Sequence, residues 1–324
     1  MNNITLPGTL LSVSPLCLGC GGFGTARTAE ESFALLDSFT ALGGNFIDTA
    51  AIYGKWEPDG LSHSELTIGK WLKRRGSADG INVCTKCAHP ELASMNVPRM
   101  SRQDIESDVD DSLRHLGVER ISLLLLHRDE EERPVEDILE SLTAMVSAGK
   151  VAHFGCSNWK PGRMREMREA ARRADVAGFS ANQVMWSLAG HDPDAIPHGQ
   201  CAMDAGTYAF HKEASLTAMC YSAQARGYFP KLALGGADAL DEGVRRTYPA
   251  ERNAGIARIL GEVSAQTGHT VGALALAYLT CQTDFPAVPV FGSRTTEQLE
   301  ECMASAEIAL DEEIMDELHK LNIK

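Results

Sequence analysis

The chain has 324 residues, enough for about two domains of roughly 150 residues or for one large α/β barrel. Its composition, 44% hydrophobic and 23% charged, is typical of a globular protein. The formal net charge of −14 argues against partners that bind through phosphates over a wide surface, so we expect neither nucleic acid nor membrane as a partner. A single phosphorylated cofactor needs only a few local donors and is compatible with this charge.

The cysteines indicate a reducing compartment. Nine cysteines, an odd number in a chain of this length, do not suggest a disulfide framework, and no secretory signal or membrane span is evident, so we expect a cytoplasmic protein. Two pairs, Cys17-x-x-Cys20 and Cys84-x-x-Cys87, raise the alternative of a zinc site. Both pairs begin inside apolar strand-like runs, where residues three apart face opposite ways, so we favour buried thiols and expect no metal.

The predicted elements alternate between short apolar strands and helices. A hairpin is predicted first, over residues 4–14. The strands that follow are predicted at residues 16–19, 45–49, 81–86, 121–127, 151–155, 180–184, 216–221 and 287–291. Helices are predicted at residues 29–42, 64–74, 101–116, 134–147, 161–174, 251–267, 271–282, 296–304 and 312–321. Residues 188–203 are expected to be irregular, and a long loop is expected from strand 216–221 through Tyr248.

Eight strand–helix units indicate a parallel sheet that closes into a barrel. The expected fold is α/β, a (β/α)8 TIM barrel forming one domain over residues 1–324, with an N-terminal β-hairpin and a C-terminal extra helix. One motif favours a different fold. Gly19-x-Gly21-x-x-Gly24, with Asp48 at a suitable distance, fits the dinucleotide-binding fingerprint of a doubly wound sheet. That pattern is short and common, so the doubly wound dehydrogenase stays as an alternative.

Several motifs resemble the aldo-keto reductase family, in its bacterial, NADP-dependent form. The run Gly44-Asn45-Phe46-Ile47-Asp48-Thr49-Ala50-x-x-Tyr53-Gly54 is similar to the best-known motif of that family. Lys86 and His127 end predicted strands, as they do in the family. Later counterparts are Gly155-Cys156-Ser157-Asn158, Asn182-Gln183, and Pro289-Val290-Phe291-Gly292-Ser293-Arg294 with Glu297-Gln298-Leu299. The match runs in order from about residue 16 to 310.

The resemblance implies four catalytic residues, Asp48, Tyr53, Lys86 and His127. Barrel active sites form at the C-terminal ends of strands, where these residues are expected to converge. Carbonyl reduction needs a proton donor, and a free tyrosine, with a pKa of about 10, is a weak acid near neutrality. We expect Lys86 to lower the pKa of Tyr53, Asp48 to hold Lys86 charged, and His127 to donate a hydrogen bond to the carbonyl oxygen. Taken singly, each residue has an ordinary structural interpretation, but the four together are hard to explain as packing.

The resemblance also implies a nicotinamide dinucleotide, NADP (as NADPH), with NAD as the alternative. The expected contacts are Gly21, Gly22, Phe23, Asp48, Ser157, Asn158, Gln183, Tyr221, Ser222, Gly292, Ser293, Arg294, Gln298 and Glu301. Of these, Ser293, Arg294 and Gln298 are expected to hold the adenosine 2′-phosphate at a helix start, where backbone amides favour an anion. Two departures from the family pattern, Ala223-Gln224-Ala225-Arg226-Gly227 and Glu301-Cys302, weaken the preference for NADP over NAD.

The implied function is an oxidoreductase that transfers a hydride between NADP(H) and the carbonyl or alcohol of a small substrate, with Tyr53 as general acid and base. The substrate classes considered are an aldehyde, a ketone or a sugar. Trp56, Trp186, His191 and Tyr228 come from predicted loops that could line the barrel mouth. The alternative function is a cofactor-binding regulatory subunit of the same fold with little catalysis. The motifs name neither the substrate, nor the favoured direction, nor the oligomeric state.

Overall fold

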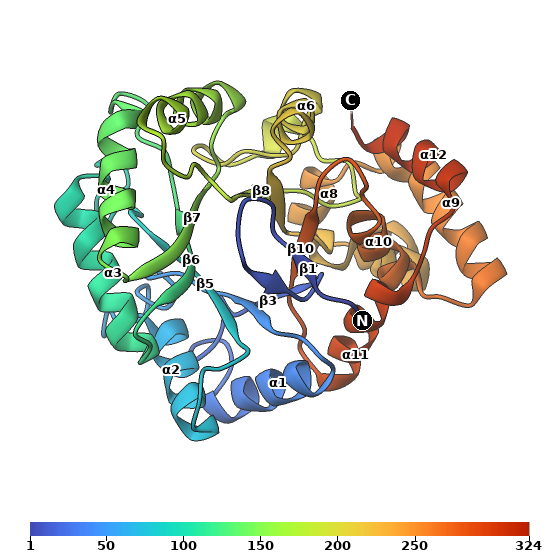
Figure 1. Ribbon diagram of the computed structural model, residues 1–324. Coiled ribbons are helices and arrows are strands. Elements are labelled where there is room, and N and C mark those ends of the chain that lie inside the picture. Colours follow the sequence, from blue (N-terminus) through green and yellow to red (C-terminus); the bar gives the residue numbers. More distant parts are fainter. Residues whose placement is uncertain (324) are drawn as a thin grey trace.

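Eight parallel strands close into a barrel in the computed structural model, which describes residues 1–323. The strands are β3 (Cys17–Gly19), β4 (Phe46–Asp48), β5 (Asn82–Cys87), β6 (Ile121–Leu126), β7 (Val151–Ser157), β8 (Ala181–Met185), β9 (Thr217–Tyr221) and β10 (Ala287–Phe291). They follow one another around the ring in chain order, and β10 pairs with β3 (Figure 1). The fold is a (β/α)8 TIM barrel, as predicted, and the closed ring excludes the doubly wound alternative. Lys324, the last residue of the expected 1–324 domain, lies outside the described residues.

Helices cover the outside of the barrel (Figure 1). They include α1 (Ala29–Ala41), α2 (His63–Arg75), α3 (Arg102–Leu116), α4 (Val135–Ser147), α5 (Pro161–Ala174), α6 (Ala205–Ala214), α9 (Ala250–Thr267), α10 (Val271–Thr280), α11 (Thr296–Ala304) and α12 (Glu312–Asn322). Local signals set their ends: Thr28 and Glu31 form a capping box on α1, and α2 and α3 end at left-handed Gly76 and Gly117. Among residues 1–323, no helix is long and apolar enough to cross a bilayer.

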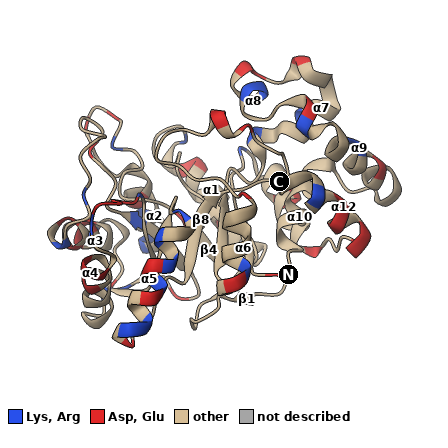
Figure 2. Cartoon of the chain, turned by 90° about the horizontal axis from the view of Figure 1, so that it is seen from above, with Lys and Arg blue, Asp and Glu red and all other residues tan. Residues whose placement is uncertain are grey.

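The structure differs from the prediction in two segments. Helix α6 was not predicted, because its buried residues are Thr207, Phe210 and His211, so that an apolar stripe is missing from the sequence. The expected loop after β9 contains two short helices, α7 (Tyr228–Gly235) and α8 (Glu242–Thr247). Pro230 lies in the first turn of α7, where proline is tolerated. Figure 2 shows α7 and α8 on the side of the molecule away from β1.

The N-terminal hairpin closes one end of the barrel. Its strands β1 (Ile4–Thr5) and β2 (Ser12–Val13) pair antiparallel, as predicted, and Figure 1 shows the hairpin across the centre of the ring. Leu6, Leu11 and Val13 pack on the inward-facing apolar side chains of the strands. These are Cys17, Phe46, Cys84, Leu123, Leu125, Ala181, Met219 and Val288. The interior at the hairpin end is therefore a packed apolar core.

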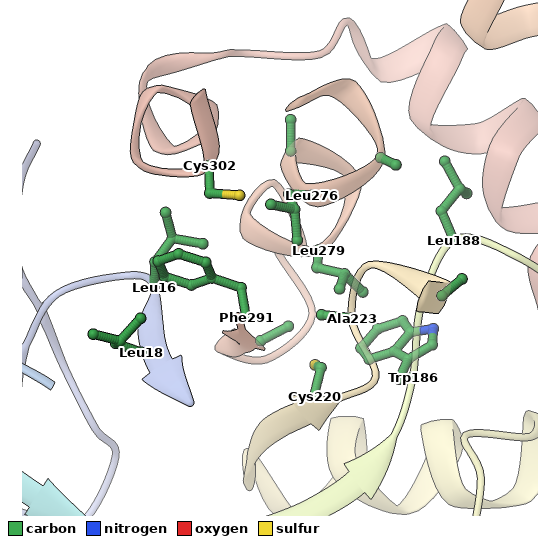
Figure 3. Packing of buried hydrophobic residues seen from close by; sticks show 14 of the residues in the cluster. Leu16, Leu18, Trp186, Leu188, Cys220, Ala223, Leu276, Leu279, Phe291 and Cys302 are labelled. Carbon is green, nitrogen blue, oxygen red and sulfur yellow. The ribbon is translucent and has the colours of Figure 1, made fainter. Parts of the chain in front are cut away.

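A second apolar layer lies between the strands and the helices. Figure 3 shows part of it, where Leu276 and Leu279 of α10 and Cys302 of α11 meet Phe291 of β10. Cys17 and Cys84 belong to the inner core, whereas Cys20 and Cys87 belong to clusters in the outer layer. The prediction that the two cysteines of each pair face opposite sides is confirmed.

Gly69 tests how closely the outer helices pack. A Cβ atom on Gly69, in α2, would lie 2.0 Å from the backbone oxygen of His115 in α3, whereas a Cβ on Gly261, in α9, would meet nothing within 4 Å. We expect Gly69→Ala to lower the free energy of unfolding by about 1 to 3 kcal/mol through overpacking. Gly261→Ala should raise it by up to about 1 kcal/mol, because alanine is the better helix former. Urea unfolding followed by circular dichroism compares the two, and equal stability of both variants would contradict the close packing.

Candidate active site

A row of ionisable side chains arises from the two-residue period of the strands. Side chains two positions apart share a face of a strand. On three neighbouring strands the inward row changes from apolar at the hairpin end to ionisable at the other end. The rows are Phe46–Asp48 in β4, Cys84–Lys86 in β5 and Leu125–His127 at the end of β6. The strand ends thus bring three of the four expected catalytic residues to one mouth.

Asp48 and Lys86 form a buried ion pair. The Lys86 Nζ lies 2.8 and 2.7 Å from the two carboxylate oxygens of Asp48 and donates to the backbone oxygen of Thr49 at 2.8 Å. Gln183 donates a further hydrogen bond to Asp48, at 2.7 Å. Burial opposes the charge on Lys86, but the Asp48 carboxylate outweighs it and raises the pKa of Lys86 above its usual range. Lys86 is therefore an ammonium group at neutral pH.

The Tyr53 hydroxyl lies above this ion pair. Its oxygen is 3.4 Å from the Lys86 Nζ, which lies 4.9 Å from the centre of the tyrosine ring. The next residue, Gly54, has a φ of 103°, and a Cβ there would lie 2.6 Å from the backbone nitrogen of His63, so glycine is required to place Tyr53.

Burial raises the pKa of Tyr53 above its ordinary value, while Lys86 acts in the opposite direction. Lys86 acts on the Tyr53 pKa in the expected direction, but desolvation of the phenol is the larger effect, so the pKa does not fall below the ordinary value of about 10. The phenol is therefore protonated at neutral pH, which is the form that an acid needs.

His127 stands beside Tyr53 as a neutral imidazole. The two rings meet edge to face with centroids 5.8 Å apart, and the His89 ring lies 4.8 Å from His127 on another side. Burial, together with the positive charges of Lys86 and Arg128, holds the pKa of His127 well below its usual range. The neutral ring keeps one N–H, so His127 can donate a single hydrogen bond to an oxygen at the mouth.

One cavity of about 1120 Å³ runs across the mouth from this cluster to the start of α11. Most of the expected site residues line it: Gly21, Asp48, Tyr53, His127, Ser157, Asn158, Gln183, Tyr221, Ser222, Gly292, Ser293, Arg294, Gln298 and Glu301. Lys86 lies beneath the lining. Gly22 and Phe23 are exceptions to the expectation, because neither lines the cavity. Phe23 is buried in the core, and its N–H donates to the Cys20 oxygen within the turn.

The ends of β7, β8 and β9 carry a hydrogen-bonded group of amide and hydroxyl side chains. Asn158 donates to the Ser157 hydroxyl at 3.0 Å, and Ser157 donates to the Gln183 backbone oxygen at 2.9 Å. The Tyr221 hydroxyl donates to the Asn158 side-chain oxygen at 2.9 Å. Because Gln183 also binds Asp48, this group is fixed relative to the ion pair. These are the polar groups that a carboxamide of a cofactor would need.

The far end of the cavity fits a phosphate. Among the described residues, the buried Ser293 hydroxyl has no hydrogen-bond partner. Arg294, the next residue, is exposed, and its backbone N–H donates to the side-chain oxygen of Gln298 at 2.9 Å. Arg27, from the loop between β3 and α1, donates to the Ser293 backbone oxygen at 2.5 Å. An orphaned hydroxyl at a helix start, with Arg294 next in sequence and Arg27 bound to the backbone of the same residue, suits an anionic ligand.

The sequence-based selection of aromatic residues was right for Trp56 and wrong for three others. Trp56 lines the cavity, whereas Trp186, His191 and Tyr228 do not. Trp186 is buried and donates to Asn322 of α12, and Tyr228 packs against Tyr248. Other lining residues were not predicted, among them Arg27, His89, Leu92, Arg128 and Gln200. Gln224 and Arg226, from the segment that departs from the family pattern, also line the cavity. Arg128 had a usable signal, because it directly follows His127.

Comparison with known proteins agrees with this geometry. The model of the family described as "Aldo/keto reductase family" matches residues 15–323. Norsolorinic acid reductase stcV of Emericella nidulans is 31% identical, over 94% of this chain and 78% of its own length. The uncharacterized oxidoreductase YrpG of Bacillus subtilis is 27% identical, over 97% of this chain and 93% of its own. Aryl-alcohol dehydrogenase GME11368 of Pestalotiopsis microspora is 26% identical, over 98% and 81%.

The family match covers nearly the whole chain and all eight barrel strands. A relative above 30% identity spans the same region, and its name is that of a reductase. The chain belongs to the aldo-keto reductase family and is an oxidoreductase.

Proposed function

We propose that this protein uses NADP(H) to interconvert a small carbonyl compound and its alcohol, with Tyr53 as the general acid and base. The observation that carries the proposal is the buried Lys86–Asp48 pair beneath the Tyr53 hydroxyl, with neutral His127 beside it. A regulatory subunit would not need this arrangement, so we favour the enzyme over a cofactor-binding subunit with little catalysis.

Each of the four residues has a distinct task in the proposed reaction. A bound nicotinamide would supply or accept the hydride at the substrate carbon. In reduction, Tyr53 gives its proton to the carbonyl oxygen, and Lys86 stabilises the phenolate that remains. Asp48 holds the ammonium group in place through both carboxylate oxygens. His127 donates a hydrogen bond to the same substrate oxygen, which polarises the carbonyl and fixes its direction.

We assign the cofactor as NADP rather than NAD from the far end of the cavity. The unpaired Ser293 hydroxyl, with Arg294 and Arg27 beside it, suits the additional 2′-phosphate that only NADP carries. The group formed by Ser157, Asn158, Gln183 and Tyr221 would hold the nicotinamide carboxamide. Gly21, Ser222, Gly292, Gln298 and Glu301 also line the cavity and complete the proposed contacts.

For the substrate, we favour an aldehyde or ketone with an apolar body over a sugar. Trp56 and Leu92 are exposed lining residues at the catalytic end of the cavity. One relative is named an aryl-alcohol dehydrogenase and another a norsolorinic acid reductase, names that support a carbonyl–alcohol reaction. We further propose that residues 1–324 form one domain. The nine free thiols suit a reducing compartment, and we propose the cytoplasm.

Removal of the Tyr53 hydroxyl should abolish most turnover. We expect Tyr53→Phe to lower kcat by about 10² to 10⁴, the usual effect of a general acid, and to leave NADPH binding nearly intact. The loss of NADPH absorbance with an aldehyde panel measures turnover, and cofactor fluorescence measures binding. Tyr228→Phe is the matched control, because Tyr228 is a buried phenol outside the cavity lining. Turnover of Tyr53→Phe close to that of Tyr228→Phe would rule out the assigned role.

Arg294 should distinguish the two nicotinamide cofactors. We expect Arg294→Ala to weaken NADPH binding about 10- to 150-fold, the range for a charge-assisted contact, and to change NADH binding little. Isothermal titration calorimetry with each cofactor measures both affinities. Arg258→Ala, at an exposed arginine of α9, serves as the control for loss of one surface charge. Equal weakening of NADPH and NADH would mean that Arg294 acts on a part that they share.

A further inference from the structure

The loop after β6 begins, beyond His127, with four consecutive charged residues, and three of them are neutralised by neighbours. They follow His127 as Arg128, Asp129, Glu130 and Glu131. The carboxylates pair with cations other than Arg128: Asp129 with Arg163 at 3.2 Å, Glu130 with Arg133 at 2.9 Å and Glu131 with Lys160 at 2.7 Å. The three acidic groups nearest in sequence are therefore already committed, and the exposed Glu132 forms no ion pair with Arg128. The Arg128 charge is thus left without a counter-ion from its own loop.

Arg128 has no ion pair anywhere in residues 1–323. Its guanidinium donates one hydrogen bond, from Nη1 to the His127 backbone oxygen at 3.0 Å, so most of its five N–H groups remain available. The side chain is half-buried and lines the cavity. Gly199, in the loop after β8, packs against it, since a Cβ there would lie 3.9 Å from the Arg128 Cδ. A partly desolvated cation without a partner is costly, and this one is held facing the cavity.

The order of strands around the barrel divides the cavity into two halves. Strands β9, β10 and β3 adjoin one another, and their loops contribute Arg226, Arg294 and Arg27 to the half proposed for the cofactor. Strands β4, β5 and β6 form the opposite half, where Arg128 lies with Tyr53 and His127. The lining residues from this half are Asp48, Ile52, Tyr53, Trp56, His89, Leu92, His127 and Arg128. Asp48 is paired with Lys86, so Arg128 is the charged lining group of this half without a partner.

We propose that Arg128 binds an anionic group of the substrate, a carboxylate or phosphoryl oxyanion, so that the preferred carbonyl substrates are acids. This inference rests on the proposed reductase function and adds the substrate class. A guanidinium presents its N–H groups as a planar fork that matches two oxygens of such an anion. Trp56 and Leu92 on the same half would contact the apolar body between the anion and the carbonyl. The Arg128 charge would also attract the anionic group of the substrate locally, against the repulsion expected from a chain of net charge −14.

Paired aldehydes with and without an anionic group test the proposal. 4-Formylbenzoate is compared with 4-formylbenzamide, its neutral isostere, and 4-formylphenyl phosphate is compared with 4-methoxybenzaldehyde. The readout is the ratio of kcat/KM for the anionic member to that for the neutral member. We expect Arg128→Gln to lower this ratio about 10- to 150-fold, mainly through KM, because a binding contact is lost. Arg128→Lys should retain part of the ratio. Arg102→Gln, at an exposed arginine of α3, is the matched control and should leave the ratio as in the wild type.

The outcomes separate this inference from the proposed function. A wild type that reduces each neutral aldehyde as well as its anionic partner, or an unchanged ratio in Arg128→Gln, overturns the anion site and leaves the reductase standing. A larger fall for one pair identifies a carboxylate or a phosphoryl group as the preferred anion. If no aldehyde is reduced, the proposed function fails, and calorimetry with benzoate and benzamide decides the anion site. The wild type should then bind benzoate in preference to benzamide and Arg128→Gln should not, whereas equal binding of the two would overturn the inference.

Discussion

The buried ion pair between Lys86 and Asp48 is the interaction on which the proposed chemistry depends. Two charges inside a barrel are costly to desolvate, and here hydrogen bonds compensate them: Asp48 accepts from Lys86 and Gln183, and Lys86 also donates to the Thr49 oxygen. Removal of either partner would leave an unpaired buried charge, at a cost of about 3 to 5 kcal/mol. The pair is thus supported by the fold, and it places a fixed positive charge beneath the Tyr53 hydroxyl.

The same strands serve stability at one end and chemistry at the other. At the hairpin end the inward rows are apolar and pack on Leu6 and Val13. Two residues further along each strand, the same rows carry Asp48 and Lys86. This arrangement keeps the costly polar groups together, where they can satisfy one another, and leaves the remaining interior to close packing. The Tyr53 pKa then reflects a balance in which burial raises it and Lys86 lowers it.

Strands and helices with a regular apolar pattern could be predicted from the sequence. The run Leu123–Leu126 indicates a strand buried on both faces, and a polar residue at its end lies at the barrel mouth by topology alone. The helix α6 could not be predicted in this way, because Thr207 and His211 occupy positions of its buried face. The buried face of such a helix can be recognised only when the partners of its polar side chains are known. His211, for example, is hydrogen-bonded to Asn182 and to the Leu216 backbone oxygen.

Properties that depend on three-dimensional surroundings were the hardest to predict. The sequence suggests that Lys86 approaches Tyr53 and lowers its pKa, and Lys86 does act in that direction. The extent to which the phenol is desolvated follows from the packing around it, so the larger effect of burial could not be predicted. Trp186 and Tyr228 come from loops near the mouth, yet their rings pack into the core instead. The role of Arg128 likewise depends on which cations have already paired with Asp129 and its neighbours.

The pKa of Tyr53 tests most directly whether the Lys86–Asp48 pair acts on the proposed acid. A carbon-13 NMR titration of ring-labelled tyrosine follows the phenols individually, and among the six tyrosines the signal missing in Tyr53→Phe identifies Tyr53. We expect Tyr53 to titrate above the value of a free tyrosine, about 10, and higher still in Lys86→Met, where the opposing charge is gone. A Tyr53 pKa at or below about 10 in the wild type, or one that does not rise in Lys86→Met, would contradict this expectation.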